Sequence, residues 1–161
     1  MAPMLEDIAN LALKRGFAVD VLVGASAFFA QDDLQLVAAL HPRLRGRYRL
    51  VAATSERQWL EVLSGAALLV SARFHHSAAA AFLGTPFAVT PGNTPDIEGL
   101  IDVLGLRRDA VLIPTADMER AAAVAAALLQ DPQPALVAAE RLEALRALTL
   151  QNFAGLNARV S

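Results

Sequence analysis

The residues best suited to chemistry lie in the segment 71–76, directly after an apolar run that is predicted to be a strand. Arg73 and His75 stand two positions apart where this strand turns into the next helix. An arginine offers a planar set of N–H donors that matches a phosphate or a carboxylate, and a histidine can move a proton near neutral pH. The start of the following helix adds free backbone N–H groups. The segment therefore predicts a site for an anionic substrate beside a proton-transferring group.

The same residues also have purely structural interpretations. Arg73 can pair with a nearby carboxylate, and His75 can cap the helix that follows. For His76, a role at the helix start or in packing is the simpler interpretation. We expect Arg73 and His75 to be catalytic, and Ser71 and His76 to be substrate-binding residues beside them.

A second candidate group follows the next apolar run. Residues 90–93 (TPGN) have the composition of a turn, and the helix after them begins with a proline at a favoured first position. We expect Gly92, Asn93 and Thr94 to contact substrate. Glu98 is a further candidate, although an acidic residue at that place also complements the helix dipole.

These residues are positioned by an alternation of short apolar runs and helical stretches. The predicted strands are residues 17–23, 48–53, 66–70, 86–90 and 110–113. The predicted helices are residues 4–15, 32–40, 54–64, 76–83, 95–104, 116–129 and 134–157, with His41-Pro42 at the end of the second. Continuously apolar strands that alternate with helices indicate the α/β class, with a parallel sheet covered on both faces. In such a sheet ligands bind outside the carboxyl ends of the strands, where the candidate residues fall.

The domain organisation is predicted to be a single Rossmann-like domain over residues 1–161. It comprises an N-terminal helix (1–16), an α/β core (17–130) of about five strands in three layers, and a C-terminal helix (134–158). Because a helix precedes the first strand, we expect the chain to correspond to one half of a two-domain enzyme.

Composition excludes several classes of function. The chain has 161 residues, of which 55% are apolar, and no apolar run reaches the roughly 18 residues that a transmembrane helix needs. The N-terminus lacks a secretory signal pattern, which indicates a cytoplasmic protein. There are no cysteines and no recognisable metal motif, so no cofactor or metal is expected. A net charge of -2 does not favour nucleic-acid binding, and the arginines at 43, 45, 47 and 49 indicate a solvated loop.

The order of motifs resembles that of a known family. The segments SARFH (71–75), GTP (84–86) and NTPDIEGL (93–100) follow one another with strands and a helix between them. They resemble the C-terminal half of the polysaccharide pyruvyl transferase family, in which an R-x-H motif, a helix, a G-x-P strand start and a turn into a helix recur. The resemblance covers about residues 17–129 and implies one Rossmann-like half of a GT-B-like enzyme.

The resemblance also implies an activity. Such a transferase moves pyruvate from phosphoenolpyruvate, its co-substrate, to a nucleotide-linked or lipid-linked sugar in exopolysaccharide or cell-wall biosynthesis. Arg73 and His75 match the R-x-H motif. Arg73 would bind the phosphate or carboxylate of phosphoenolpyruvate, and His75 would act as general acid or base. Asp96 stands where the family often has lysine. An acidic residue at this position would weaken anion binding.

Two alternatives are left open. The chain could instead be the nucleotide-sugar-binding half of a GT-B glycosyltransferase, with Arg73 on a diphosphate and Glu98 on a hydroxyl. It could also be a non-catalytic, shortened module. Peripheral membrane association, a missing N-terminal domain and homo-oligomerisation are compatible with each of these.

Overall fold

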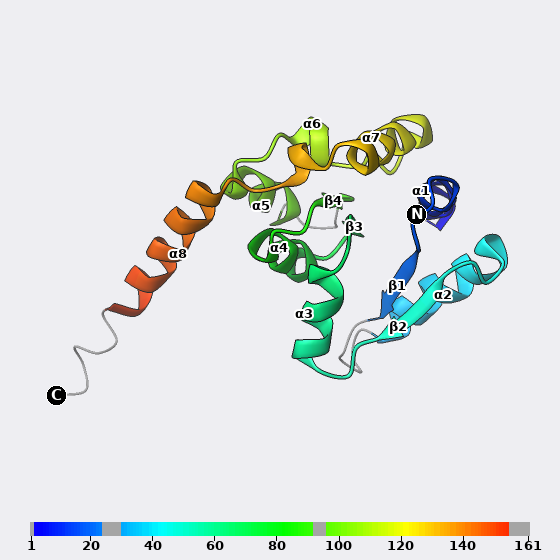
Figure 1. Ribbon diagram of the computed structural model, residues 1–161, viewed down its shortest axis with the longest axis horizontal. Coiled ribbons are helices and arrows are strands. Elements are labelled where there is room, and N and C mark those ends of the chain that lie inside the picture. The colour runs from blue at the N-terminus through cyan, green and yellow to red at the C-terminus, as the bar shows by residue number, and fades with distance from the viewer. Residues whose placement is uncertain (1, 24–29, 92–95, 155–161) are drawn as a thin grey trace.

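The computed structural model describes residues 2–23, 30–91 and 96–154, which form a mixed α/β structure (Figure 1). The alternation of helices and strands predicted from the sequence is confirmed. The elements in chain order are α1 (Ala2–Lys14), β1 (Asp20–Val23), α2 (Ala30–Leu44), β2 (Arg49–Ala52), α3 (Glu56–Ser64), β3 (Leu69–Ser71), α4 (Phe74–Leu83), β4 (Phe87–Val89), α5 (Asp96–Leu104), α6 (Arg108–Val111), α7 (Met118–Gln130), the 3-10 turn η1 (Gln133–Ala135) and α8 (Ala139–Ala154).

The strands of the described residues form two short parallel sheets. β1 pairs with β2, and β3 pairs with β4. The sequence predicted one sheet of about five strands, and the structure shows this only in part. Each strand is shorter than the apolar run that predicted it.

The predicted fifth strand differs most from the prediction. Residues 108–111 form one helical turn, α6, and Leu112 makes a single parallel bridge to Val89. The N–H of Ile113 also donates to the carbonyl of Val89 at 2.7 Å. Val111 and Ile113 are nevertheless fully buried. The apolar pattern therefore predicted the burial of this segment correctly, whereas the local backbone turns within it.

Several helix boundaries also differ from prediction. α2 continues through Pro42 to Leu44, whose side chain is fully buried, and ends only before Arg45 at φ 50°. α4 begins two residues earlier than predicted and ends at Gly84, whose φ of 73° suits glycine. The C-terminal helix is divided into η1 and α8, because Leu136 between them is extended.

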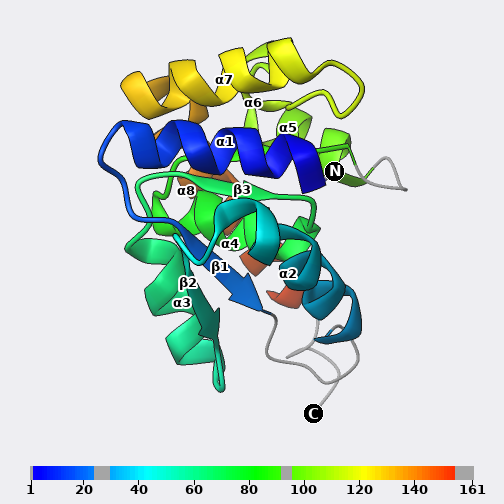
Figure 2. The same cartoon turned by 90° about the vertical axis from the view of Figure 1, so that its right-hand side faces the viewer.

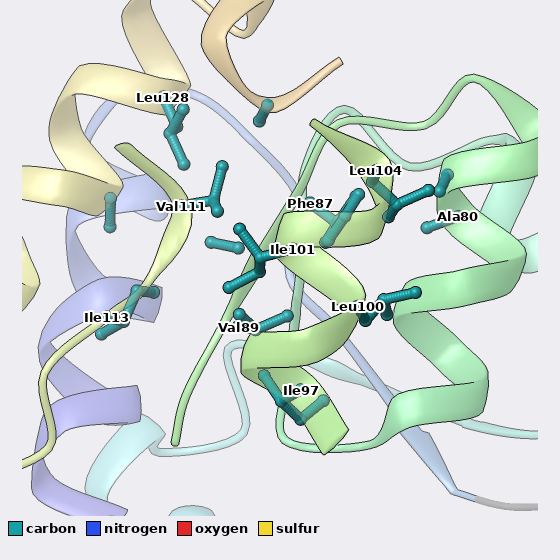
Figure 3. Packing of buried hydrophobic residues seen from close by; sticks show 14 of the residues in the cluster. Ala80, Phe87, Val89, Ile97, Leu100, Ile101, Leu104, Val111, Ile113 and Leu128 are labelled. Carbon is teal, nitrogen blue, oxygen red and sulfur yellow. The ribbon is translucent and has the colours of Figure 1, made fainter. Parts of the chain in front are cut away.

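The main hydrophobic core surrounds β3 and β4 (Figure 3). It combines the two strands with side chains from α4, α5, α6 and α7 and with Met4 and Ile8 of α1. Phe87, Ile101 and Ile113 are among its fully buried members. A much smaller cluster consists of Ala9, Leu40 and Leu44, between α1 and α2.

Helix α1 joins the two clusters. It lies beside α7 and also packs against α2 (Figure 2). α8 contacts the large core through Leu145, and its later part extends away from the body (Figure 1). Within the described residues, no helix combines the length and apolar character that crossing a bilayer requires.

Candidate functional site

The carboxyl ends of β3 and β4 form the edge that carries the candidate residues. The register pairs Ser71 with Val89, so the two strands end side by side. The N–H of Thr90 donates to the carbonyl of Ser71 at 3.1 Å. The segment that leads to Arg73 and the segment that follows β4 therefore lie next to each other.

Two buried serines fix the turn that positions Arg73. The backbone N–H of Arg73 donates to Ser71 Oγ at 3.0 Å, and the carbonyl of Arg73 accepts from Ser77 Oγ at 3.1 Å. Both serines are buried. Arg73 occupies the N-cap position of α4 with an extended backbone. Ser71, predicted to bind substrate, thus uses its hydroxyl to hold the turn.

The guanidinium of Arg73 is paired with a carboxylate from elsewhere in the chain. Its Nη2 donates to Oδ1 of Asp33 on α2, 40 positions earlier. The side chains of Arg73 and Asp33 are 31% and 13% exposed. The alternative that Arg73 pairs with a nearby carboxylate is therefore realised here.

The two adjacent histidines occupy different environments. His75 is exposed, with its ring edge-on to Phe74 at a centroid distance of 5.7 Å. His76 is half-buried, with its ring 5.4 Å from the Trp59 ring of α3. Burial and the positive charge of Arg73 lower the pKa of His76. The lowered pKa favours the neutral form of the His76 ring.

A buried hydroxyl at this edge has no hydrogen-bond partner. Thr90 is 2% exposed, and its Oγ1 has no partner in the structure as described. Thr85, which is equally buried, donates its hydroxyl to the carbonyl of Leu63 at 3.0 Å. An unsatisfied buried hydroxyl costs stability, so Thr90 is a candidate for a ligand contact at this edge.

The remaining predicted site residues do not join this cluster in the described part of the chain. Glu98 accepts a hydrogen bond from Arg108 at 2.7 Å, and Arg108 also pairs with Asp102 at 2.6 Å. Hydrogen bonding to Arg108 lowers the pKa of Asp102. Glu98 thus takes part in a surface ion network. Gly92, Asn93 and Thr94 lie outside the described residues.

The cluster of arginines that was predicted to be a solvated loop contacts polar side chains of this chain. Arg43 pairs with Glu6 at 2.7 Å, and Arg49 pairs with Asp20 at 2.6 Å. Arg47 donates to Asn10 Oδ1 at 2.7 Å and borders an open groove of about 660 Å³ between α1 and α7. This groove is lined by α1, Arg47 and alanines of α7, and it does not include Arg73. Among the described residues, no group of three or more His, Cys, Asp or Glu side chains could hold a metal ion.

Sequence reasoning did not select three residues that the structure brings to this site. Thr90 is the last residue of the predicted strand 86–90, so the rule that selects residues after a strand did not include it. Asp33 lies within the predicted helix 32–40, and nothing in the sequence relates it to Arg73. Trp59 likewise carries no signal for its contact with His76. Comparisons of the chain with family models, with curated proteins and with solved structures found no match.

Proposed function

We propose that this chain is the anion-binding half of a pyruvyl transferase-like enzyme, which takes phosphoenolpyruvate as donor and a sugar of an exopolysaccharide or cell-wall precursor as acceptor. The observation that carries the proposal is the placement of Arg73 at the N-terminus of α4, at the carboxyl edge of two parallel strands. A guanidinium and a helix N-terminus that act on the same point favour a phosphate or a carboxylate. Phosphoenolpyruvate carries both groups.

The proposal includes a finer fold. We propose that β2, β1, β3, β4 and the segment at Leu112 belong to one Rossmann-like sheet of the GT-B type. Three features support this arrangement: both strand pairs are parallel, Leu112 bridges to Val89, and α1 packs against both clusters. In a sheet of this kind Arg73 stands at the ligand-binding edge.

The proposed reaction forms a ketal on two sugar hydroxyls. Two C–O bonds form at C2 of phosphoenolpyruvate, the C2–O bond to phosphate breaks, and phosphate leaves. One hydroxyl proton ends on the methylene carbon, which becomes a methyl group, and the other leaves with phosphate. Arg73 binds the carboxylate or the phosphate. His75, which is exposed, and His76, whose neutral form is favoured, are the groups that can move these protons.

A titration of the purified chain with phosphoenolpyruvate tests the donor assignment. We expect saturable binding in calorimetry and a loss of at least about tenfold in affinity for Arg73→Ala. Arg49→Ala is the matched control, because it also removes an ion-paired arginine but lies at the start of β2 and not in the turn between β3 and α4. Binding that Arg73→Ala does not weaken would reject the site, and tighter binding of a nucleotide sugar would favour the glycosyltransferase alternative.

Thr90→Val provides a second, independent test. The substitution removes a hydroxyl that has no partner in the described structure. If the hydroxyl serves a ligand, the variant should bind phosphoenolpyruvate more weakly while its stability is unchanged or increased. Weaker binding with reduced stability would indicate a packing defect instead.

A non-catalytic module is the second candidate function. The ion pair between Arg73 and Asp33 favours it, because a guanidinium with an internal carboxylate partner also serves as a structural link between α2 and the β3–α4 turn. A well-folded chain that binds neither phosphoenolpyruvate nor a nucleotide sugar would support this candidate.

A further inference from the structure

The ion pair between Asp33 and Arg73 differs from the other ion pairs of the described residues. It is the least exposed of them, with side chains at 13% and 31%. The other pairs have at least one partner that is more than 40% exposed. Removing these two charges from water is costly, so a contribution to stability is a weak explanation for this pair.

The position of Asp33 suggests another explanation. Its carboxylate comes from α2 and occupies the guanidinium at the N-terminus of α4, the point where an external anion would be bound. A carboxylate of Asp33 and a carboxylate or phosphate of a ligand need the same N–H donors. The backbone N–H of Thr90 donates to the carbonyl of Ser71, at the start of the turn that carries Arg73, and the buried Thr90 hydroxyl has no partner among the described residues.

We propose that Asp33 is a built-in competitor that occupies Arg73 in the ligand-free protein and is displaced by an anionic ligand. The inference rests on the proposed function only in that it uses the same anion site. It adds discrimination between anions. An anion that binds only Arg73 cannot displace the carboxylate of Asp33, because a carboxylate in the same chain is always present at high effective concentration. Only a ligand with further contacts at this edge binds well. Displacement also releases the link between α2 and the β3–α4 turn.

The competing interpretation gives Asp33 the opposite effect. If Asp33 positions Arg73 so that the remaining N–H donors meet the ligand, loss of the carboxylate weakens binding. If Asp33 competes, its loss strengthens binding. Asp33→Asn separates the two interpretations because the amide keeps the shape of the side chain and removes its charge.

The experiment compares anion affinities by calorimetry in four proteins: wild type, Asp33→Asn, Asp20→Asn and the double variant Asp33→Asn/Arg73→Gln. The probes are inorganic phosphate, pyruvate and phosphoenolpyruvate. We expect Asp33→Asn to bind phosphate and phosphoenolpyruvate at least about tenfold more tightly than wild type. The double variant should lose this gain. Asp20→Asn, which removes the carboxylate from the exposed pair with Arg49, should leave affinity unchanged. If Asp33→Asn is poorly folded, Asp33→Ser replaces it and the same gain is expected.

The outcomes separate this inference from the proposed function. Tighter phosphate binding by Asp33→Asn without preference for phosphoenolpyruvate supports the competitor and rejects the donor assignment. Equal or weaker binding of phosphoenolpyruvate by Asp33→Asn overturns the competitor and leaves the donor assignment in place. Absence of binding by every protein and probe overturns both.

Discussion

The two strand pairs of this protein are both short and parallel, but their environments differ. All three residues of β4 are fully buried, and the β3–β4 pair lies within the large core. In β2, Leu50 is 48% exposed. Among the described residues, the buried cluster of this half consists of Ala9, Leu40 and Leu44, with Leu5, Val19, Leu36 and Tyr48 partly buried against it. The residues of the candidate site that hold the turn, Ser71 and Ser77, belong to the well-packed half.

This difference separates the rigid and the movable parts of the site. The β3–β4 half fixes the backbone of Arg73 through buried hydrogen bonds. Asp33 reaches Arg73 from α2, which packs against β1 and α1 in the other half. Regions with few buried apolar contacts open at lower free energy than a core does. If Asp33 competes with a ligand for Arg73, it can therefore move away with α2 while the backbone of Arg73 stays in place.

The largest expected effect tests whether the two halves differ in stability. Phe87→Ala removes a fully buried ring from the large core and should lower the free energy of unfolding by about 3–5 kcal/mol. Leu44→Ala, also fully buried but in the small cluster, should cost closer to about 2 kcal/mol, because a thinly packed site can relax around the cavity. Urea denaturation of both variants measures the difference. A cost for Leu44→Ala that equals the cost for Phe87→Ala would remove the contrast between the halves.

A second prediction concerns α1, which contributes to both clusters. Met4 is buried in the large core, and Ala9 is buried in the small cluster. Met4→Ala should lower stability by about 2–4 kcal/mol. It should also speed amide hydrogen exchange in β1 and β2 more than in β3 and β4. Asp7→Ala, on the exposed side of α1, is the control and should leave both exchange patterns unchanged. Uniform acceleration in all four strands would show that α1 does not link two separable halves.

A pair of threonine substitutions distinguishes a stabilising residue from one kept for another purpose. Thr85→Val breaks the hydrogen bond to the carbonyl of Leu63 and should cost about 1–2 kcal/mol. Thr90→Val removes an unpartnered hydroxyl from the structure as described and should be neutral or stabilising. Thermal unfolding of the two variants provides the comparison. Equal losses would mean that Thr90 is satisfied in solution, which would weaken the case for its role at the site.

The sequence predicted the elements better than it predicted their pairing. Apolar runs identified the positions of β1 to β4, because a short apolar run between two helical stretches is a local pattern that can be read from the sequence alone. The run at 110–113 was also recognised as buried, yet it forms a helical turn and one bridge. Whether a buried apolar segment extends or turns depends on the strand beside it, which no local pattern contains.

The candidate site was predictable to a similar degree. The rule that ligands meet the carboxyl ends of strands selected Ser71 and Arg73, and their local geometry follows from the turn between β3 and α4. Asp33 could not be selected in this way, because its contact with Arg73 spans 40 positions. Glu98 was chosen for its place near the start of a helix, and in the structure its carboxylate accepts a hydrogen bond from Arg108. Long-range ion pairs of this kind depend on tertiary packing, and spacing alone does not report them.

The smallest expected effect is a pH dependence that comes from His76, at the contact between α3 and α4. Its pKa is lowered in the folded protein by burial and by Arg73, so the unfolded chain binds the proton more tightly. Stability is therefore complete above the ordinary histidine pKa of 6.5 and decreases as pH falls below that value. His76→Gln should reduce this decrease between neutral and mildly acidic pH, measured as the free energy of unfolding in urea. His75→Gln, at an exposed position in the same turn, is the control and should retain the wild-type slope. If His76→Gln also retains it, the half-buried ring against Trp59 takes up its proton as readily in the folded protein as in the unfolded chain, and the lowered pKa of His76 would be rejected.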